Sequence, residues 1–533
     1  MDGRRLSSVV TLCLGVLLWG AGEIASADWP HWRGPSFNGT TAQSPALVDA
    51  FAEGVPNKVW ESEPLYEKEH VGHGSVTVAG GRVYALAYAR FKVPIEERTL
   101  QGHRVNSAGY AQGIPEELSA EIEKARVSDE RKGLKDRKEI ENWINTWLTA
   151  NVPEEQKRYR GTAQARLRAG ESALPLDVLA KLNTVRDKPF PNQDAFEAWL
   201  KENQIPEEHH KGIRSWLVTQ KDVSRDFVHC LDVATGKTIW KTELDSWWMW
   251  YPASSTPTVV NGKCYVLNSE AAVCCLDAQT GEKLWKSEEI GRRGNTHNRS
   301  SSVLVVDGVA VAQSAAQAAG FDAQTGETLW KERKIRSEYG SAVPWESGGK
   351  KYAVIVGAGK VFCVEPKTGN IVWSVKAADG PTPTILGDRM AISNGKDGLT
   401  FYKLTDAEPE VLWSVEFDDT FTSPVIHDGH VYAFGEAYGK RNQGRAVCVD
   451  AATGKVLWSE VLGPPQHSSP ALADGKLIAI GGGTLYLVKA SPEKYTELGK
   501  LKAGLEQWSS VSFADGKVFL RTGRTVVCYD LTK

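Results

Sequence analysis

Short hydrophobic runs that end at a glycine turn recur along most of the chain. Each run follows a stretch of small residues, as Ser254–Pro257 precedes the run that ends at Asn261-Gly262. Small residues let strands crowd around an axis, and Asn-Gly or Asp-Gly dipeptides favour tight hairpins. Eight such starts are present, at 74–75, 254–257, 300–302, 341–344, 382–383, 423–424, 469–470 and 509–510. The pattern predicts eight small antiparallel sheets.

A second motif, an acidic residue followed by Thr-Gly and then a tryptophan, lies in the later part of most of these units. Five well-kept copies occupy Cys230–Trp240, Cys275–Trp285, Gly320–Trp330, Cys363–Trp373 and Cys448–Trp458. Weaker copies occupy Phe401–Trp413 and Val488–Leu498, and Cys528–Asp530 begins another. The period of 40–45 residues is typical of a β-propeller with four strands in each blade.

We therefore predict an all-β fold, an eight-bladed β-propeller formed by residues 57–91 and 227–533. The last blade begins at Trp508 and lacks its outermost strand, whereas Lys58–Glu61 matches that strand. Residues 57–66 are expected to close the last blade, because closure removes an exposed sheet edge. A seven-bladed ring with an extra hairpin is the alternative.

Residues 92–226 interrupt the first blade and are predicted to form a helical insertion. Pro115 and the two acidic residues after it suit the first turn of a helix. Ile140, Trp143, Ile144 and Trp147 have the spacing of one apolar helical face. This insertion could cap a mouth of the propeller, contact a protein partner, or decorate the rim.

The N-terminus has the pattern of an export signal. Arg4 and Arg5 precede the apolar stretch Val9–Trp19, which is too short to span a bilayer. Ala25–Ala27 fits a signal-peptide cleavage site. We expect a signal peptide at 1–27, an N-terminal extension at 28–56, and a periplasmic or secreted mature chain without a transmembrane segment. An uncleaved anchor is the alternative.

Charge and composition narrow the class of protein. The 533 residues contain 63 Lys and Arg against 66 Asp and Glu, a net charge of −3. Nucleic-acid binders usually carry a basic excess, so no nucleic-acid partner is expected. The 19 tryptophans outnumber the 15 tyrosines and the 14 phenylalanines, as expected if tryptophan fills one repeated structural position.

The repeated Asp-x-x-Thr-Gly-x-x-x-Trp motif resembles the tryptophan-docking motif of the pyrroloquinoline-quinone (PQQ) repeat propellers. The resemblance covers residues 57–91 and 227–533. The segment Asp28–Gly39 is also similar to the start of exported PQQ-like proteins of the type common in planctomycete-like bacteria. The resemblance implies that each repeat tryptophan packs against the neighbouring blade rather than acting in catalysis.

The dehydrogenases of that family imply a further possibility, a site for PQQ and a calcium ion beneath a vicinal cysteine pair. Cys274 and Cys275 would match the pair. However, Cys275 holds the repeat position also occupied by Cys230, Cys363, Cys448 and Cys528, where a small buried residue is expected. No Glu, Asn and Asp set in the family's order is apparent. We predict no metal site and no certain cofactor, leave PQQ with calcium as an alternative, and leave open a disulfide between Cys274 and either Cys264 or Cys275.

The loops that lead into the innermost strands should converge on one mouth of the axial channel. They carry aromatic, histidine, arginine and carboxylate residues, which could together hold a polar ring such as a sugar or a quinone. The candidates for catalysis are His297, Arg299 and Glu338. The candidates for cofactor or ligand contact are Trp248, Trp250, Tyr251, Asn298, Tyr339, Asp379, Asp419, His467 and Trp508, and His73 belongs to the same ring. Packing beside the second blade or against the insertion is the alternative role for Trp247–Tyr251.

The leading hypothesis is an exported propeller that acts as a binding or assembly scaffold. It would take a small molecule or a protein at its mouth, and a protein partner through residues 92–226. One alternative is a quinoprotein oxidoreductase that uses PQQ and acts on an alcohol or a sugar. Another is a sugar-processing enzyme that uses the same mouth.

Overall fold

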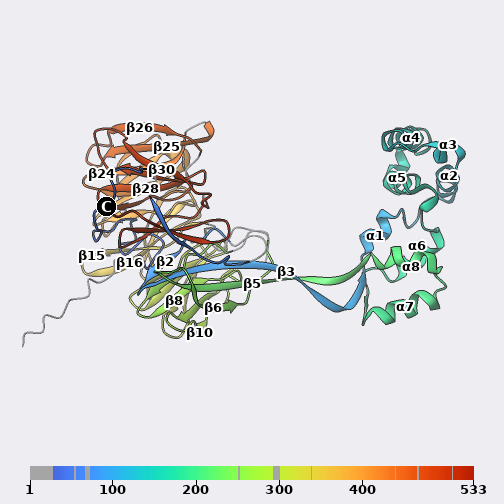
Figure 1. Ribbon diagram of the computed structural model, residues 1–533, viewed down its shortest axis with the longest axis horizontal. Coiled ribbons are helices and arrows are strands. Elements are labelled where there is room, and N and C mark those ends of the chain that lie inside the picture. The colour runs from blue at the N-terminus through green and yellow to red at the C-terminus, as the bar shows by residue number, and fades with distance from the viewer. Residues whose placement is uncertain are drawn as a thin grey trace, which may run out of the picture. The chain divides into compact units, whose positions relative to one another are not determined.

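The structure is a computed structural model that describes residues 28–52, 56–66, 72–249, 253–291, 300–337, 339–419, 421–437, 440–464, 467–506 and 508–533. The expected signal peptide at 1–27 lies outside these residues. The chain divides into two compact units. Ser224–Lys533 and the chain up to Arg90 form the first, and Phe91–Val223 form the second (Figure 1).

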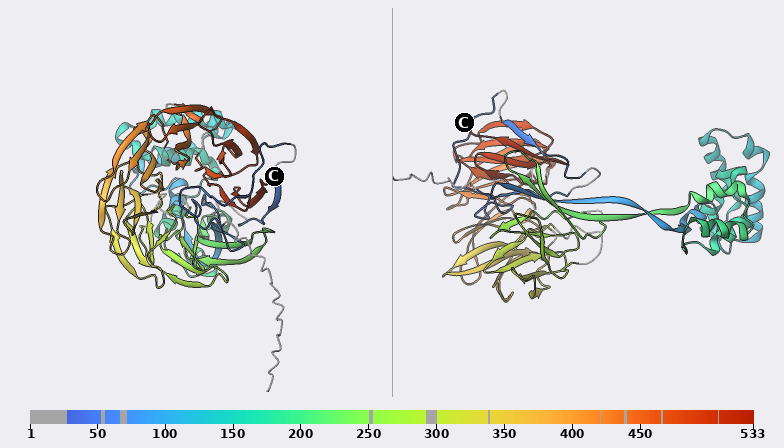
Figure 2. Two further views of the ribbon diagram at one scale, coloured as in Figure 1. Left: turned by 90° about the vertical axis from the view of Figure 1, so that its left-hand side faces the viewer. Right: turned by 60° about the horizontal axis from the view of Figure 1, so that its bottom comes forward.

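The first unit is an eight-bladed β-propeller, as the repeat predicts. Its described residues form eight antiparallel sheets that surround a common axis in the left view of Figure 2. The first blade contains β2 (Thr77–Ala79), β3 (Arg82–Leu100), β5 (Leu217–Asp232) and β6 (Thr238–Leu244), and the second contains β7 (Thr258–Val260), β8 (Lys263–Leu267), β9 (Val273–Asp277) and β10 (Lys283–Lys286). The third blade contains β11 (Leu304–Val306), β12 (Val309–Gln313), β13 (Ala318–Asp322) and β14 (Thr328–Glu332), and the fourth contains β15 (Val343–Ser347), β16 (Lys350–Gly357), β17 (Lys360–Val364) and β18 (Ile371–Lys376).

The other four blades complete the ring. The fifth blade contains β19 (Thr384–Leu386), β20 (Arg389–Ser393), β21 (Leu399–Lys403) and β22 (Glu410–Val415), and the sixth contains β23 (Val425–His427), β24 (His430–Ala437), β25 (Lys440–Asp450) and β26 (Val456–Leu462). The seventh blade contains β27 (Ala471–Ala473), β28 (Lys476–Gly481), β29 (Thr484–Lys489) and β30 (Glu497–Lys502), and the eighth contains β31 (Ser512–Ala514), β32 (Lys517–Arg521), β33 (Val526–Asp530) and β1 (Asn57–Glu61). In the last blade β1 pairs antiparallel with β33, so the two ends of the chain share one sheet. This pairing closes the ring.

Five of the repeat tryptophans dock on the Thr-Gly turn of the next blade, namely Trp60, Trp240, Trp285, Trp330 and Trp413. A Cβ atom added to Gly281 would lie 2.6 Å from the Trp240 ring, and one added to Gly454 would lie 2.7 Å from Trp413. The Trp240 indole also donates a 3.3 Å hydrogen bond to the carbonyl of Ala278 in the second blade. The glycine is therefore required twice, by its positive φ and by the indole that covers it.

The docking also connects the last blade to the first. Trp60 of β1 covers Gly236 and donates a 2.9 Å hydrogen bond to the carbonyl of Val233. The turn that follows Trp373 around the ring lacks the Thr-Gly pair, and the Trp373 indole nitrogen has no hydrogen-bond partner among the described residues. That junction therefore has no docking glycine.

The N-terminal segment crosses one end of the channel. Trp29 forms a two-way backbone bridge with Val78 of the first blade, with hydrogen bonds of 2.8 and 2.9 Å. The Gly39 carbonyl accepts a 2.8 Å hydrogen bond from the backbone of Leu472 in the seventh blade, two blades away from the first. On the far side of the ring, Phe37 packs on the hydrophobic cores between the third, fourth and fifth blades. The segment therefore ties opposite sides of the ring together.

Arg33 anchors this segment. Its guanidinium donates hydrogen bonds of 2.7, 2.8 and 2.9 Å to the carbonyls of Pro424, Pro470 and Asn38. Arg33 is 2% exposed, and burial lowers its pKa to about 9. Three carbonyl dipoles hold this cation, and no carboxylate contacts it among the described residues.

The second unit contains the predicted helices. They are α1 (Gly102–Ser107), α2 (Glu116–Arg126), α3 (Asp129–Gly133), α4 (Arg137–Asn151), α5 (Arg160–Ala169), α6 (Leu176–Thr184), α7 (Gln193–Glu202) and α8 (Glu207–Arg214), with the 3₁₀ turns Glu154–Tyr159 and Gly170–Ser172 and the short strand β4 (Pro189–Phe190). Their apolar faces form two separate hydrophobic cores. Arg166 is buried and is paired with Glu123 at 2.7 Å.

The strands of the first blade extend further than the sequence pattern indicates. β3 continues to Leu100 and β5 begins at Leu217, so both run into the region expected to be helical. The reason lies in the alternation of half-buried Phe91, Val93 and Ile95 with exposed residues, which has the period of a strand. That alternation is short and rich in charge, so it is weak evidence when only the sequence is considered.

The docking of tryptophan on glycine can be tested by a matched pair of substitutions in the third blade. In Gly326→Ala the new Cβ would lie 2.5 Å from the Trp285 ring at φ +79°, whereas in Gly308→Ala it has open space at φ +78°. Both variants should lose about 1–2 kcal/mol of unfolding free energy because alanine is strained at a positive φ. Only Gly326→Ala should lose roughly 1–3 kcal/mol more, because its Cβ overpacks against the indole. Urea denaturation measures the unfolding free energy of each variant. Equal losses would contradict the docking.

The Arg33 anchor can be tested in the same way. Arg33→Ala leaves three buried carbonyls without their donor, so we expect a loss of about 3 kcal/mol or more in unfolding free energy. Arg389→Ala is the control, because that arginine is exposed and pairs only with the neighbouring Asp388, a contact worth under about 1 kcal/mol. A loss in Arg33→Ala no larger than in the control would refute the anchor.

Candidate functional site

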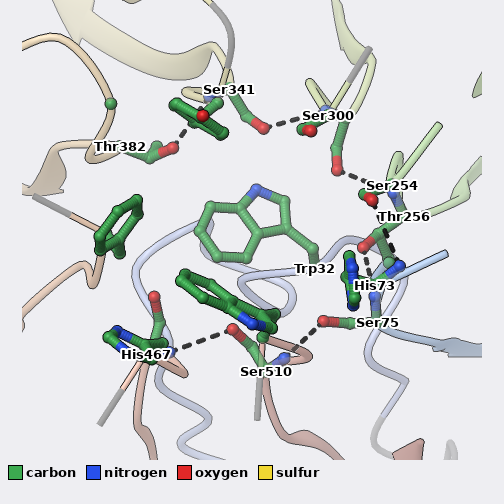
Figure 3. A pocket seen from close by; sticks show the side chains of 17 residues that line it. Trp32, His73, Ser75, Ser254, Thr256, Ser300, Ser341, Thr382, His467 and Ser510 are labelled. Carbon is green, nitrogen blue, oxygen red and sulfur yellow. Dashed lines mark hydrogen bonds between the residues drawn. The ribbon is translucent and has the colours of Figure 1, made fainter. Parts of the chain in front are cut away.

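A ring of hydroxyl side chains surrounds the channel, one from each blade. Seven backbone N–H groups donate to the hydroxyl of the next blade, as Ser75 donates to Thr256 at 2.9 Å and Ser510 donates to Ser75 at 2.8 Å. The other five links join residues 256, 302, 341 and 382 in order, and residues 423, 469 and 510 in order. The small residues in the sequence pattern are therefore the inter-blade connections themselves (Figure 3).

This ring leaves hydrogen-bonding capacity unused. A hydroxyl that accepts an N–H keeps its own O–H to donate, and the seven accepting hydroxyls donate to no group among the described residues. The eighth hydroxyl, on Ser423, has no partner of either kind in the described part of the chain. All eight residues are buried.

Trp32 lies in the middle of the ring. Figure 3 shows its indole surrounded by the labelled serine and threonine side chains. The N-terminal segment that carries it contacts Pro424 and Pro470, which directly follow the ring residues Ser423 and Ser469. Trp32 is therefore the floor of a cavity of about 510 Å³ that receives residues from all eight blades.

One side of this cavity is aromatic. Trp508 and His467 stack with ring centroids 4.2 Å apart and an interplanar angle of 5°. Phe421 stands edge-on to both, at 5.1 Å from Trp508 and 5.5 Å from His467. Tyr339 is edge-on to Phe421 at 6.0 Å. Such offset and edge-to-face contacts fix the rings relative to one another, so the wall is pre-organised.

Two histidines of the lining have carboxylate partners. His73 Nδ1 lies 3.3 Å from Glu506 Oε1, which also accepts a 3.3 Å hydrogen bond from the Trp508 backbone. Burial opposes ionisation of Glu506, but these hydrogen bonds outweigh it and lower its pKa. His467 Nε2 lies 3.7 Å from Glu436 Oε1, and burial lowers the pKa of His467 against that charge.

Asp419 supports the aromatic wall from behind. Its buried Oδ2 accepts hydrogen bonds from the backbone of Phe421 and Thr422 and from the Thr422 hydroxyl, at 3.2, 2.7 and 2.7 Å. Oδ1 has no partner among the described residues. Burial raises the pKa of Asp419 to about 7, and Glu436 adds to the rise while the Thr422 hydrogen bonds oppose it.

The sequence-based candidates fall into three groups. Tyr339, His467 and Trp508 line the cavity together with His73, and Asp419 lies behind its wall. Asp379 is exposed, and neither it nor Trp248, whose ring lies 5.9 Å from the Arg90 guanidinium carbon, belongs to the lining. The remaining candidates lie outside the described residues: Trp250, Tyr251, His297, Asn298, Arg299 and Glu338.

Two residues that shape the cavity are missing from the sequence-based set. Trp32 lies in a segment expected to be a mere extension, and Phe421 lies in a loop noted only for its aspartates. The signal for Trp32 is the run of Trp29, His31, Trp32 and Arg33, which is unusually rich in aromatic rings for a free terminus. Nothing in the sequence indicates that this run enters the channel.

The described residues do not fit PQQ with calcium. PQQ carries several carboxylates, yet the described lining contains no lysine, arginine, aspartate or glutamate. No group of three or more His, Cys, Asp or Glu side chains in the described ranges is placed to hold a metal ion. Cys274 and Cys275 are free, buried thiols of β9, outside the lining, and burial raises the pKa of Cys274 to about 12.

Comparison with known proteins agrees with the repeat. The profile of the family described as outer membrane protein assembly factor BamB matches residues 214–343, 316–437 and 406–532. No curated protein matches the chain. Within the described ranges, no helix has the length and apolar character needed to cross a membrane.

Several solved structures are similar. BamB from Moraxella catarrhalis is 15% identical with a TM-score of 0.44, over 55% of this chain and 86% of its own. A europium-containing methanol dehydrogenase is 13% identical with a TM-score of 0.43, over 55% and 79%. The quinohemoprotein alcohol dehydrogenase from Comamonas testosteroni is 15% identical with a TM-score of 0.43, over 58% and 73%.

The ionisation of Asp419 yields a testable pH dependence. Its folded pKa of about 7 lies above the ordinary aspartate value of 3.8, so the folded state binds a proton that the unfolded state releases between about pH 4 and 7. Stability should therefore fall as pH rises through that window, by up to about 4 kcal/mol from this group.

Asp419→Asn keeps an oxygen that can accept the Thr422 hydrogen bonds and removes the charge. We expect urea denaturation to show a smaller fall in unfolding free energy from pH 5 to pH 8 in this variant than in the wild type. Asp379→Asn, at an exposed site, should keep the wild-type slope. The same slope in all three proteins would refute the assignment.

Proposed function

The chain belongs to the family described as outer membrane protein assembly factor BamB, and we propose that its propeller is a ligand-binding member of this family. The ligand is a small polar ring held in the axial cavity. The observation that carries the proposal is the cavity of about 510 Å³ with Trp32 as its floor. That volume lies within the range of roughly 300–1,000 Å³ typical of small-molecule sites.

The composition of the cavity supports binding. Trp508 stays 38% exposed although it stacks on His467, so part of its ring remains available to a ligand. Tyr339 is similarly exposed at 39%. Large aromatic surfaces beside unused hydroxyl donors match the usual division of a ligand site into apolar area and a few orienting polar groups.

The proposal extends to where the protein works and what it contacts. We propose that the mature chain works outside the cytoplasm, which the signal-like pattern of residues 1–27 supports. We also propose that the helical unit Phe91–Val223 contacts a protein partner. The family is described as an assembly factor, and this unit has hydrophobic cores of its own.

Ligand binding can be tested by thermal shift and isothermal titration calorimetry with a panel of neutral sugars, nucleosides and quinones. At least one class should raise the melting temperature of the full mature chain. Trp508→Ala and Trp32→Ala should weaken binding of that ligand by about fivefold or more, because each removes a stacking surface worth about 1 kcal/mol or more.

Trp248→Ala is the matched control. Trp248 is 39% exposed, close to the 38% of Trp508, and lies outside the cavity lining, so its removal should leave the affinity unchanged. No binding by any member of the panel, or equal loss in all three variants, would overturn the proposal. A bound-quinone spectrum with dye reduction after addition of PQQ and calcium would favour the oxidoreductase instead.

A further inference from the structure

We propose that the ligand of the axial cavity is a neutral carbohydrate, taken up as a free sugar or as the end of a glycan chain. This inference rests on the proposed function and names its ligand class. It depends on three properties of the site, namely the hydroxyl ring, the aromatic wall and the placement of charge.

The hydroxyl ring matches the hydrogen-bonding groups of a sugar. Each ring hydroxyl that accepts a backbone N–H, as Thr382 accepts from Ser341 at 2.9 Å, is held in position by the propeller. It still has one donor and one lone pair to offer. Sugar hydroxyls also donate and accept, so they can pair with both the free donor and the free lone pair of a ring hydroxyl. A ligand that has acceptors alone can pair only with the donor.

The aromatic wall and floor match the ring faces of a sugar. A pyranose ring presents C–H groups on its faces and hydroxyls around its edge. The indoles of Trp32 and Trp508 offer apolar faces, and the surrounding hydroxyls lie around Trp32 in Figure 3. A sugar that stacks on the floor would therefore direct its edge hydroxyls at the ring of serines and threonines.

The placement of charge disfavours anionic ligands. Arg33 lies among three backbone carbonyls, and Arg521 is buried beside the carbonyls of Gly74 and Leu86. Neither arginine belongs to the lining. Of the described lining residues only His73 and His467 can carry a positive charge, and each lies beside a carboxylate, Glu506 or Glu436. A phosphate or carboxylate would enter the cavity without a free counter-charge from these residues.

The shape of the channel restricts how a glycan could enter. The N-terminal segment crosses the channel below the hydroxyl ring, and Trp32 occupies its middle. A polymer therefore cannot thread through the propeller. Only a free sugar or a chain end can reach the floor, and the two sources differ in how affinity depends on chain length.

The test is calorimetric titration of the full mature chain with neutral sugars and their charged counterparts. Neutral mono- and oligosaccharides should bind, and glucuronic acid and glucose 6-phosphate should bind at least about tenfold more weakly than glucose. If the ligand is a free sugar, lengthening the chain should not improve affinity. If it is a glycan end, oligosaccharides should bind more tightly than the monosaccharide.

A matched pair of threonines tests the hydroxyl ring. Thr382 lines the cavity, whereas Thr258, also buried, lies outside the lining and donates a 2.7 Å hydrogen bond to the Val303 carbonyl. Thr382→Val and Thr258→Val each remove one internal hydrogen bond, so their melting temperatures should fall to a similar extent. Only Thr382→Val should weaken sugar binding, by about threefold to tenfold.

The outcomes separate this inference from the function on which it rests. Binding of nucleosides or quinones without any sugar would overturn the carbohydrate class and leave the ligand-binding function standing. Tighter binding of the acidic sugars, or equal affinity in Thr382→Val and Thr258→Val, would also overturn it. No binding of any compound would overturn both proposals.

Discussion

The contact between a repeat tryptophan and the glycine of the next blade is the interaction on which the rest of the structure depends. A blade of four short strands has two apolar faces and cannot bury both by itself. The indole of Trp240 covers Gly281, that of Trp285 covers Gly326, and Trp60 of the last blade covers Gly236 of the first. The contact is kept at five of the eight junctions. Since the contact is the same at each junction where it is kept, the blades curve evenly and the ring can close.

Closure creates a channel, and the N-terminal segment makes it a pocket. Eight innermost strands need small residues where they meet, and hydroxyls at those positions satisfy the neighbouring backbone N–H groups. A channel lined this way is polar and open at both ends. Arg33, which binds carbonyls of the sixth and seventh blades, holds Trp32 across one end. The floor of the site is thus supplied by a segment remote in sequence from the loops that form its walls.

The sequence accounts for much of the wall and little of the floor. His467 and Trp508 can be predicted because the repeat places their loops at the mouth of the channel, and the structure stacks them 4.2 Å apart. Asp379 lies one residue before the equivalent position, which Gly380 occupies in the lining, and is exposed. The repeat therefore predicts which loop reaches the mouth but not which of its residues faces the cavity. Phe421 is not predicted from the sequence because the two aspartates of its loop are the residues expected to carry chemistry, whereas an apolar ring by itself indicates only packing.

Period and turn chemistry are local properties, so the sequence by itself determined the propeller, its eight blades, the strand that closes the last blade and the presence of a helical insertion. Tertiary structure alone decided the rest. It set Trp32 in the channel, buried Arg33 among carbonyls, and removed Asp419 from water so that its pKa rises to about 7. The first two depend on contacts between residues separated by hundreds of positions, and the third depends on how completely the folded chain excludes water. No local pattern encodes which distant groups will meet or which will be buried.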